Sequence, residues 1–337
     1  MAGPRHSLIG ERNTPMTTTP CRIVMLDRAT FPPGTRLDGP DIAHELVLHE
    51  RTAPAEAAAR VADADVIITN KVPITRAVLD AAPRLKLVVV AATGYDIIDV
   101  KACTERGVTV CNVRDYARHT VPEHTFALIL ALRRSLLPYH RSVGEGRWQQ
   151  SGQFCYFDYP IQDLAGSTLG IFGGGAIGQS VAAIARAFGM NVLFAGRRGA
   201  PVEASRTLFE TVLEEADILT FHLPLRPETR NMIGAAEFAR MWRKPLIINT
   251  GRGGLVDELA LVSALQNGQI AGAGFDVVTT EPMPADHPFQ KLLGRQNFIL
   301  TPHIAWASRE ATQVVADQVF RNITNFFDGK PSNVVLP

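Results

Sequence analysis

The chain has 337 residues, too many for one typical core, and at about 150 residues per domain it suggests two domains. Hydrophobic residues make up 46% and charged residues 20%, as in an ordinary globular protein. The 34 basic and 33 acidic side chains leave a net charge of +1, so electrostatics give no reason to expect nucleic acid or a membrane as partner. No apolar run approaches the roughly 18–20 residues that span a bilayer.

The cysteines and the N-terminus favour a cytoplasmic protein. The cysteines are Cys21, Cys103, Cys111 and Cys155. They form no C-x-x-C pair and have no histidine at metal-ligand spacing, so we expect free thiols in a reducing compartment and no metal site. The first twenty residues lack the apolar stretch of a signal peptide, and we expect a disordered leader over 1–20, with Met16 as a second candidate start.

Short β-branched runs alternate with helical patterns from Arg22 onward, which is typical of parallel strands joined by crossover helices. The strands expected in this first series are 22–27, 65–69, 86–92 and 107–112. Helices are expected over 53–61 and 75–82. A long, almost uniformly apolar helix is expected over 119–137, with Pro122 near its first turn, where a missing N–H costs little.

A second series of strands follows the long helix. The strands expected here are 167–172, 191–196, 216–222, 245–250, 271–277 and 297–303. The last element, 308–329, is expected to be an amphipathic helix that stops at Gly329 and is a candidate to pack back on the first sheet. The two series predict an α/β fold with two doubly wound parallel-sheet domains, each sheet covered on both faces.

A glycine-rich segment after the strand 167–172 matches G-x-G-x-x-G through Gly173, Gly175 and Gly178. Gly173 would allow the tight turn, Gly175 would let a pyrophosphate approach the backbone, and Gly178 would let the helix press on the strand. The N–H groups at the helix start would bind the anion. The pattern predicts a dinucleotide site; a merely glycine-rich turn is the alternative.

The residue that reads the cofactor's ribose is expected about twenty positions later, where an NAD enzyme usually places a carboxylate. Here the strand ends in Gly196, Arg197 and Arg198. A 2′-phosphate fits two guanidiniums better than a ribose hydroxyl does. The sequence therefore favours NADP(H), with NAD(H) as a possible cofactor; two solvated arginines are the alternative.

Three charged side chains follow successive strands of the second series: Arg252, Glu281 and His303. Reduction of a 2-keto acid needs a cation to hold the carboxylate and a tuned proton donor for the developing alkoxide. Ligands of open parallel sheets bind at the carboxyl ends of the strands, where these residues lie. Taken singly, each has an ordinary explanation as a solvated arginine, a surface acid and a capping or core histidine.

At this point the chain resembles the D-isomer-specific 2-hydroxyacid dehydrogenase family, from Arg22 to Leu336. The motifs that carry the resemblance are GGGAIG (173–178), HLPLRPETRNMI (222–233), NTGRGGLVDE (249–258), FDVVTTEP (275–282) and TPHIAWAS (301–308). The resemblance implies that Arg252 binds the substrate, that His303 is the acid/base and that Glu281 is its carboxylate partner. It implies a Rossmann cofactor domain and a flavodoxin-like substrate domain with a cleft between them, which would close to exclude water.

The resemblance also assigns the remaining site positions. Together with the loop glycines and the two arginines derived above, which depart from many relatives at the end of this strand, the expected cofactor-binding residues are Gly173, Gly175, Ala176, Ile177, Gly178, Arg197, Arg198, His222, Leu223, Pro224, Thr250, Gly251, Arg252, Asp276, His303 and Ala305. The substrate-binding residues are Ala92, Thr93, Gly94, Arg252, His303 and Trp148. The substrate domain is expected to comprise 21–117 and 298–337, and the cofactor domain 118–297.

Within the family the chain most resembles hydroxypyruvate reductases, also called glycerate dehydrogenases. The segments that carry this likeness are 26–30, 69–74, 90–96, 119–134 and 146–161. The implied function is NAD(P)H-dependent reduction of hydroxypyruvate or glyoxylate to D-glycerate or glycolate, and the reverse. Alternatives are another short-chain 2-keto acid reductase, a formate dehydrogenase, or a non-catalytic dinucleotide-sensing protein of corepressor type, for which an intact proton donor would serve no purpose.

The insert between the long helix and the glycine loop, 139–166, is rich in aromatic residues. They are Tyr139, Trp148, Phe154, Tyr156, Phe157 and Tyr159. Aromatic side chains in a connecting segment favour burial, and a partner subunit is the nearest candidate. We expect a homodimer with 139–166 as its arm, which the resemblance supports, and with Trp148 close to the neighbouring active site; packing of the insert on its own domain is the alternative.

Overall fold

The computed structural model of the chain describes residues 20–201 and 203–336. The chain divides into two compact units: unit 1 runs up to Val113 and resumes at Ala316, and unit 2 is Arg114–Val315. The leader expected over 1–20 lies outside the described residues, apart from Pro20. In the described part of the chain, no helix is both long enough and apolar enough to cross a membrane.

Unit 1 is built on a five-stranded sheet in the order β2-β1-β3-β4-β5. The strands are β1 (Cys21–Met25), β2 (His44–Leu48), β3 (Val66–Thr69), β4 (Leu87–Val90) and β5 (Thr109–Cys111). Every pairing is parallel. This is the flavodoxin-like strand order. Strand β2 was not expected, because it lies at the edge of the sheet and alternates polar with apolar residues too briefly to stand out.

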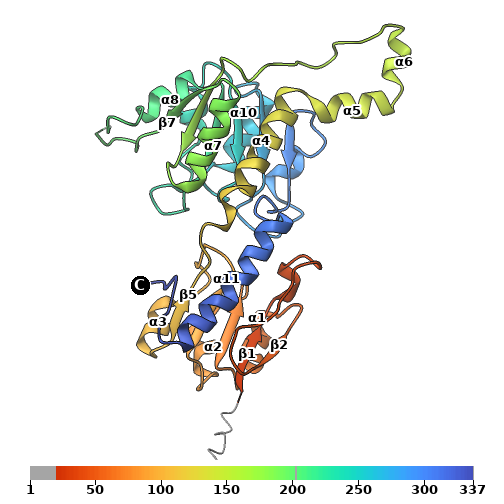
Figure 1. Cartoon of the computed structure of the whole chain (residues 1–337). Coiled ribbons are helices and arrows are strands. Elements are labelled where there is room, and N and C mark those ends of the chain that lie inside the picture. The colour runs from red at the N-terminus through yellow and green to blue at the C-terminus, as the bar shows by residue number, and fades with distance from the viewer. Residues whose placement is uncertain (1–19, 202, 337) are drawn as a thin grey trace, which may run out of the picture. The chain divides into compact units, whose positions relative to one another are not determined.

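Helices cover the sheet of unit 1. They are α1 (Pro54–Arg60), α2 (Arg76–Asp80), α3 (Val100–Glu105) and, from Ala316 on, α11 (Arg309–Phe327). Alternate strand residues such as Val24 and Ile67 share a buried apolar cluster with residues of α1 to α3. As expected, the last helix packs back on this unit: Asn322 of α11 donates a 2.8 Å hydrogen bond to the Asn112 carbonyl beside β5 (Figure 1).

Unit 2 holds a six-stranded parallel sheet in the order β11-β10-β9-β8-β6-β7. The strands are β6 (Thr168–Phe172), β7 (Asn191–Phe194), β8 (Ile218–Phe221), β9 (Leu246–Asn249), β10 (Gly272–Phe275) and β11 (Phe298–Leu300). The chain leaves β6 toward β7 and then crosses to the other side of β6 for β8. The carboxyl ends of β6 and β8 therefore flank the topological switch point, where such sheets bind ligands.

The sheet of unit 2 is apolar on both faces. Its helices are α4 (Thr120–Arg133), α7 (Ala176–Ala187), α8 (Phe209–Glu215), α9 (Ala235–Phe238) and α10 (Glu258–Gln266). Ile171 of β6 packs with residues of α4 and α7, whereas its neighbour Phe172 packs with residues of α8, α9 and α10. Cover on both faces makes this unit doubly wound, as expected for a parallel sheet.

Two expected boundaries are wrong. The long helix ends at Arg133, because Ser135 takes a left-handed conformation with φ of +50° and its hydroxyl donates to the Pro160 carbonyl at 2.6 Å. A new helix, α5 (Leu136–Gly144), starts after it. The segment from 298 was assigned to the substrate domain, but β11 pairs with β10, so the division falls inside α11 at Val315 and Ala316.

The aromatic insert forms an extended arm made of α5 and α6 (Arg147–Ser151) that projects from the body of unit 2 (Figure 1). Two of its tyrosines, Tyr156 and Tyr159, pack edge to face against Tyr139. By contrast, the side chains of Phe154 and Phe157 are 88% and 81% exposed. The arm is therefore internally ordered but leaves large apolar groups uncovered in the single chain.

Candidate active site

The glycine loop joins β6 to α7, and two of its glycines are required by close backbone contacts. Gly173 has φ of +107°, and a Cβ there would lie 2.3 Å from the His222 carbonyl oxygen. A Cβ on Gly178 would lie 2.0 Å from the carbonyl oxygen of Gly173. The loop therefore lies tightly between β8 and the first turn of α7, as the motif predicts.

Gly175 faces open space, since a Cβ at this position would meet nothing within 4 Å, and it is the N-cap of α7 without any side-chain cap. The first-turn N–H groups of Ala176, Ile177 and Gly178 follow it. A helix start with uncapped N–H groups and open space is suited to a phosphate group. These residues fit the pyrophosphate of a dinucleotide.

At the carboxyl end of β7 the two arginines differ. Arg197 is exposed. Arg198 is engaged by the protein: its guanidinium donates to the Met232 carbonyl at 2.5 Å, forms an ion pair with Glu237 at 2.9 Å and lies over the Phe209 ring. Of the two residues expected to read the ribose, only Arg197 is uncommitted in this arrangement.

Arg252 lies in the loop after β9, between two glycines that the packing requires. A Cβ on Gly251 would lie 2.7 Å from the Phe221 carbonyl oxygen, and one on Gly253 would lie 2.1 Å from the carbonyl of Val278. The side-chain amide of Asn249 further donates to the Arg252 carbonyl at 2.9 Å. The loop is thus held against the end of β8 and the segment after β10, and Arg252 is half-buried there.

Glu281 and His303 meet, although 22 residues separate them. Nδ1 of His303 lies 2.6 Å from Oε2 of Glu281, and the other oxygen of Glu281 accepts the Val278 N–H at 3.2 Å. Because the carboxylate occupies Nδ1, Nε2 is the ring nitrogen left to exchange a proton with a substrate. This contact joins two of the three side chains that the strand-end pattern singled out.

Asp276 holds the histidine loop. Its buried carboxylate accepts hydrogen bonds from the Thr301 hydroxyl at 2.5 Å and from the N–H groups of Ile304 and Ala305 at 2.9 and 2.8 Å. His303 itself has a left-handed backbone with φ of +55°, which costs energy for a residue with a side chain and must be imposed by its surroundings. Asp276 imposes it.

The other expected cofactor positions also lie around these strand ends. The N–H of His222 donates to the Phe172 carbonyl at 2.8 Å, and burial lowers the pKa of His222 to about 4, so the imidazole is neutral at pH 7. Leu223 packs on the core, and Pro224 is exposed. The Thr250 hydroxyl is 2.9 Å from that of Thr125 on α4.

In unit 1, the expected substrate loop follows β4. The Thr93 hydroxyl donates to the Val113 carbonyl at 2.9 Å, and Asn112 donates to the Thr93 carbonyl at 2.8 Å. The N–H of Val113 donates to the Ala92 carbonyl at 3.1 Å. Within the described residues, the N–H groups of Thr93 and Gly94 have no acceptor, so both can bind an anion.

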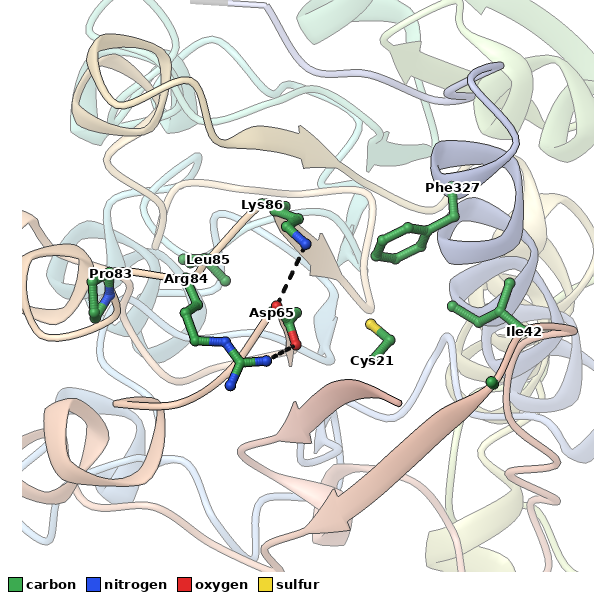
Figure 2. A pocket seen from close by; sticks show the side chains of 9 residues that line it. Cys21, Ile42, Asp65, Pro83, Arg84, Leu85, Lys86 and Phe327 are labelled. Atoms are coloured by element: carbon green, nitrogen blue, oxygen red, sulfur yellow. Dashed lines mark hydrogen bonds and ion pairs between the residues drawn. The ribbon is translucent and has the colours of Figure 1, made fainter. Parts of the chain in front are cut away.

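Unit 1 also has a pocket of about 690 Å³ (Figure 2). It lies among the amino ends of β1, β3 and β4, whereas the expected substrate loop follows the carboxyl end of β4. The buried carboxylate of Asp65 pairs there with Arg84 at 2.7 Å and Lys86 at 3.6 Å. Burial, reinforced by Asp65, raises the pKa of Cys21 to about 11, so its thiol is protonated at neutral pH. With its charges paired and its thiol unreactive, this pocket offers no group for the chemistry.

The sequence reasoning did not include two features of unit 2. Glu258 and His287 form another carboxylate–imidazole pair at 2.9 Å, which is far less exposed than that of Glu281 and His303. Glu258 also accepts the Thr279 N–H at 2.7 Å, which fixes the segment before Glu281. The guanidinium of Arg206 lies against Gly174 of the glycine loop. Neither feature has a spacing or motif that marks it in the sequence.

Comparison with known proteins agrees with this arrangement. Residues 126–305 match the family model of the D-isomer specific 2-hydroxyacid dehydrogenase, NAD binding domain. A glycerate dehydrogenase of Methylorubrum extorquens is 48% identical over 315 residues, 93% of this chain and 98% of that protein. A hydroxypyruvate reductase of Blautia hydrogenotrophica is 36% identical and covers 93% and 99%.

A solved structure gives the same result. The NADPH-dependent glyoxylate/hydroxypyruvate reductase of Sinorhizobium meliloti, in complex with citrate, superposes with a TM-score of 0.76 at 31% identity, over 94% of this chain and 97% of that one. The strand orders, the glycine loop and the paired Glu281 and His303 lead to the same conclusion. The chain belongs to the D-isomer specific 2-hydroxyacid dehydrogenase family and is an oxidoreductase that reduces 2-keto acids to 2-hydroxy acids on an NAD(P)-binding Rossmann domain.

Proposed function

We propose that the chain reduces hydroxypyruvate and glyoxylate to D-glycerate and glycolate, and catalyses the reverse reaction, with NADPH as the preferred cofactor. The observation that carries the reaction type is the 2.6 Å contact between His303 and Glu281, in the same unit as the half-buried Arg252. The proposed substrates follow the relatives, which are named glycerate dehydrogenase, hydroxypyruvate reductase and glyoxylate reductase.

When bound along the glycine loop and the first turn of α7, a nicotinamide cofactor would supply a hydride to C2 of the keto acid. Arg252 holds the substrate carboxylate with its planar fork and polarises the ketone. His303 delivers the proton of Nε2 to the ketone oxygen, while Glu281 on Nδ1 stabilises the imidazolium. In the reverse direction neutral His303 takes the proton from the hydroxyl.

The substrate proposal is tested by steady-state turnover with six keto acids: hydroxypyruvate, glyoxylate, pyruvate, 2-ketobutyrate, phenylpyruvate and 2-ketoisocaproate. We expect hydroxypyruvate and glyoxylate, the two substrates without an apolar side chain, to have the highest kcat/KM. A higher kcat/KM for a long apolar keto acid would overturn the proposed substrates, although the reaction type would stand. His303→Asn with the same substrates is the matched control for proton transfer.

The cofactor proposal rests on the end of β7. A carboxylate there would repel a 2′-phosphate, and Gly196 removes that obstacle. The exposed Arg197 supplies a charged donor at this position, and the S. meliloti relative is described as NADPH-dependent. Charge-assisted hydrogen bonds are worth roughly 1.5–3 kcal/mol each, so we expect kcat/KM to favour NADPH over NADH by about ten- to a hundredfold. A ratio at or below one contradicts the proposal.

We further propose that the chain forms a homodimer through the arm 139–166 and works in the cytoplasm. Phe154 and Phe157, both more than 80% exposed in the single chain, would be covered by the partner, and Trp148 would approach the partner's active site. The four cysteines are free, as suits a reducing compartment. Light scattering at micromolar concentration tests the dimer: a mass near 73 kDa, about twice the 36.7 kDa of one chain, is expected, and a monomeric mass would end the proposal.

A further inference from the structure

We propose that Arg206, rather than Arg198, is the second arginine that binds the 2′-phosphate of NADPH. This inference rests on the proposed preference for NADPH. Arg206 lies 28 residues beyond Gly178, past the position where the ribose-reading residue is normally sought. The tertiary structure nevertheless brings its side chain back to the glycine loop.

The backbone next to Arg206 is fixed to the end of β7. Thr207 N–H donates to the Phe194 carbonyl at 2.8 Å, and Gly196 N–H donates to the Thr207 carbonyl at 2.7 Å. Ala195 and Thr207 form a parallel bridge. These bonds extend the sheet by one short segment beside β7, so Arg206 is anchored where the strand ends.

From this position the guanidinium of Arg206 reaches the loop. A Cβ built on Gly174 would lie 2.4 Å from its Nη2 and 2.6 Å from its Nη1, so the group rests on the loop backbone and only a glycine leaves it room. It also lies over the ring of Phe194, with Cζ 5.4 Å from the ring centroid. The contact with the ring restricts the side chain without using any of its N–H donors.

The donors of Arg206 are available. Among the residues that the structure describes, its guanidinium has no hydrogen-bond acceptor and no carboxylate partner, and the residue is half-buried. Arg198 differs, because its Nη2 already donates to the Met232 carbonyl and forms an ion pair with Glu237, which hold the side chain in place. A half-buried guanidinium with free donors beside a phosphate-binding loop is suited to a bidentate contact with a dianionic phosphate.

Its location selects the 2′-phosphate over the pyrophosphate. The pyrophosphate is expected at the open face of Gly175 and the first turn of α7. Arg206 instead lies between Gly174 and the last residue of β7, on the side where a Rossmann fold reads the ribose hydroxyls. Arg206 and the exposed Arg197 would then hold the phosphate from two segments.

The test measures binding of two cofactor fragments, adenosine 2′,5′-bisphosphate and 5′-AMP, by calorimetry on the full chain. The wild type is expected to prefer the bisphosphate. Arg206→Ala should weaken bisphosphate binding by about ten- to a hundredfold, with 5′-AMP changed less than about threefold. Gly174→Ala should act in the same direction, because the new methyl group displaces the guanidinium tip while the charge is kept.

Arg186→Ala is the matched control, since it removes an exposed arginine from the last turn of α7, the end opposite the glycine loop. It should leave the ratio of the two affinities unchanged. A wild type that prefers 5′-AMP would overturn the proposed NADPH preference itself. A wild type that prefers the bisphosphate, together with an unchanged ratio in Arg206→Ala, would overturn the role of Arg206 alone. Equal weakening of both fragments would show a general effect on the loop and would also overturn it.

Discussion

Replacing Glu281 with glutamine should slow the oxidation of D-glycerate. In that direction His303 takes a proton from the substrate hydroxyl, and the carboxylate 2.6 Å from Nδ1 stabilises the imidazolium that forms. Glutamine keeps the size and a hydrogen-bonding oxygen but removes the negative charge. The positive charge that develops on the ring in the transition state then lacks its counter-charge, so kcat/KM falls.

The magnitude follows from the geometry. A contact of this length puts the two charge centres about 4 Å apart, where a unit pair interacts by about 1 kcal/mol in water and about 4 kcal/mol at an effective dielectric constant of 20. The side chains of His303 and Glu281 are 27% and 34% exposed, so solvent screening keeps the value near the lower limit. At about 1.4 kcal/mol per tenfold in rate, kcat/KM should fall by about five- to tenfold.

The assay is kcat/KM for D-glycerate oxidation at saturating NADP⁺ and one fixed pH. Glu258→Gln is the matched control: it makes the same chemical change in another carboxylate–imidazole pair of unit 2, formed with His287. Its kcat/KM should stay close to that of the wild type even if the protein loses some stability. If Glu281→Gln and the wild type have the same kcat/KM, the carboxylate does not act on His303 and the reasoning is refuted.

Three further outcomes are expected. Arg252→Lys should lose at least about a hundredfold in kcat/KM, because lysine keeps the charge but lacks the planar fork; near-normal kinetics would remove Arg252 from the site. Gly178→Ala should weaken NADPH binding at least about tenfold in a fluorescence titration, since its Cβ would lie 2.0 Å from the Gly173 oxygen; unchanged affinity would show that the loop can shift freely. His222 has its pKa lowered to about 4 by burial, against about 6.5 in the unfolded chain, so it lowers stability as the pH falls from about 6.5 to 4. The melting temperature of His222→Gln should fall less steeply over that range, and parallel curves would argue against a lowered pKa of His222.

The sequence determined the parts of this protein that depend on local pattern. Alternating β and α runs specify parallel sheets, because each strand buried on both faces must be apolar throughout. The glycines at 173 and 178 were predictable because close backbone contacts tolerate no side chain there. Arg252, Glu281 and His303 could be singled out because the carboxyl ends of parallel strands converge on one edge of a sheet.

Only the tertiary structure decided which of these groups meet and which side chains are already engaged. The approach of Glu281 to His303 depends on loops after two different strands and on Asp276, which imposes the strained backbone of the histidine. The sequence does not distinguish Arg198 from Arg206. In the structure, Arg198 forms an ion pair with Glu237, whereas the guanidinium of Arg206 contacts Gly174 of the glycine loop. The direction of a side chain depends on packing between segments that are far apart in the chain, and the local sequence pattern does not predict that packing.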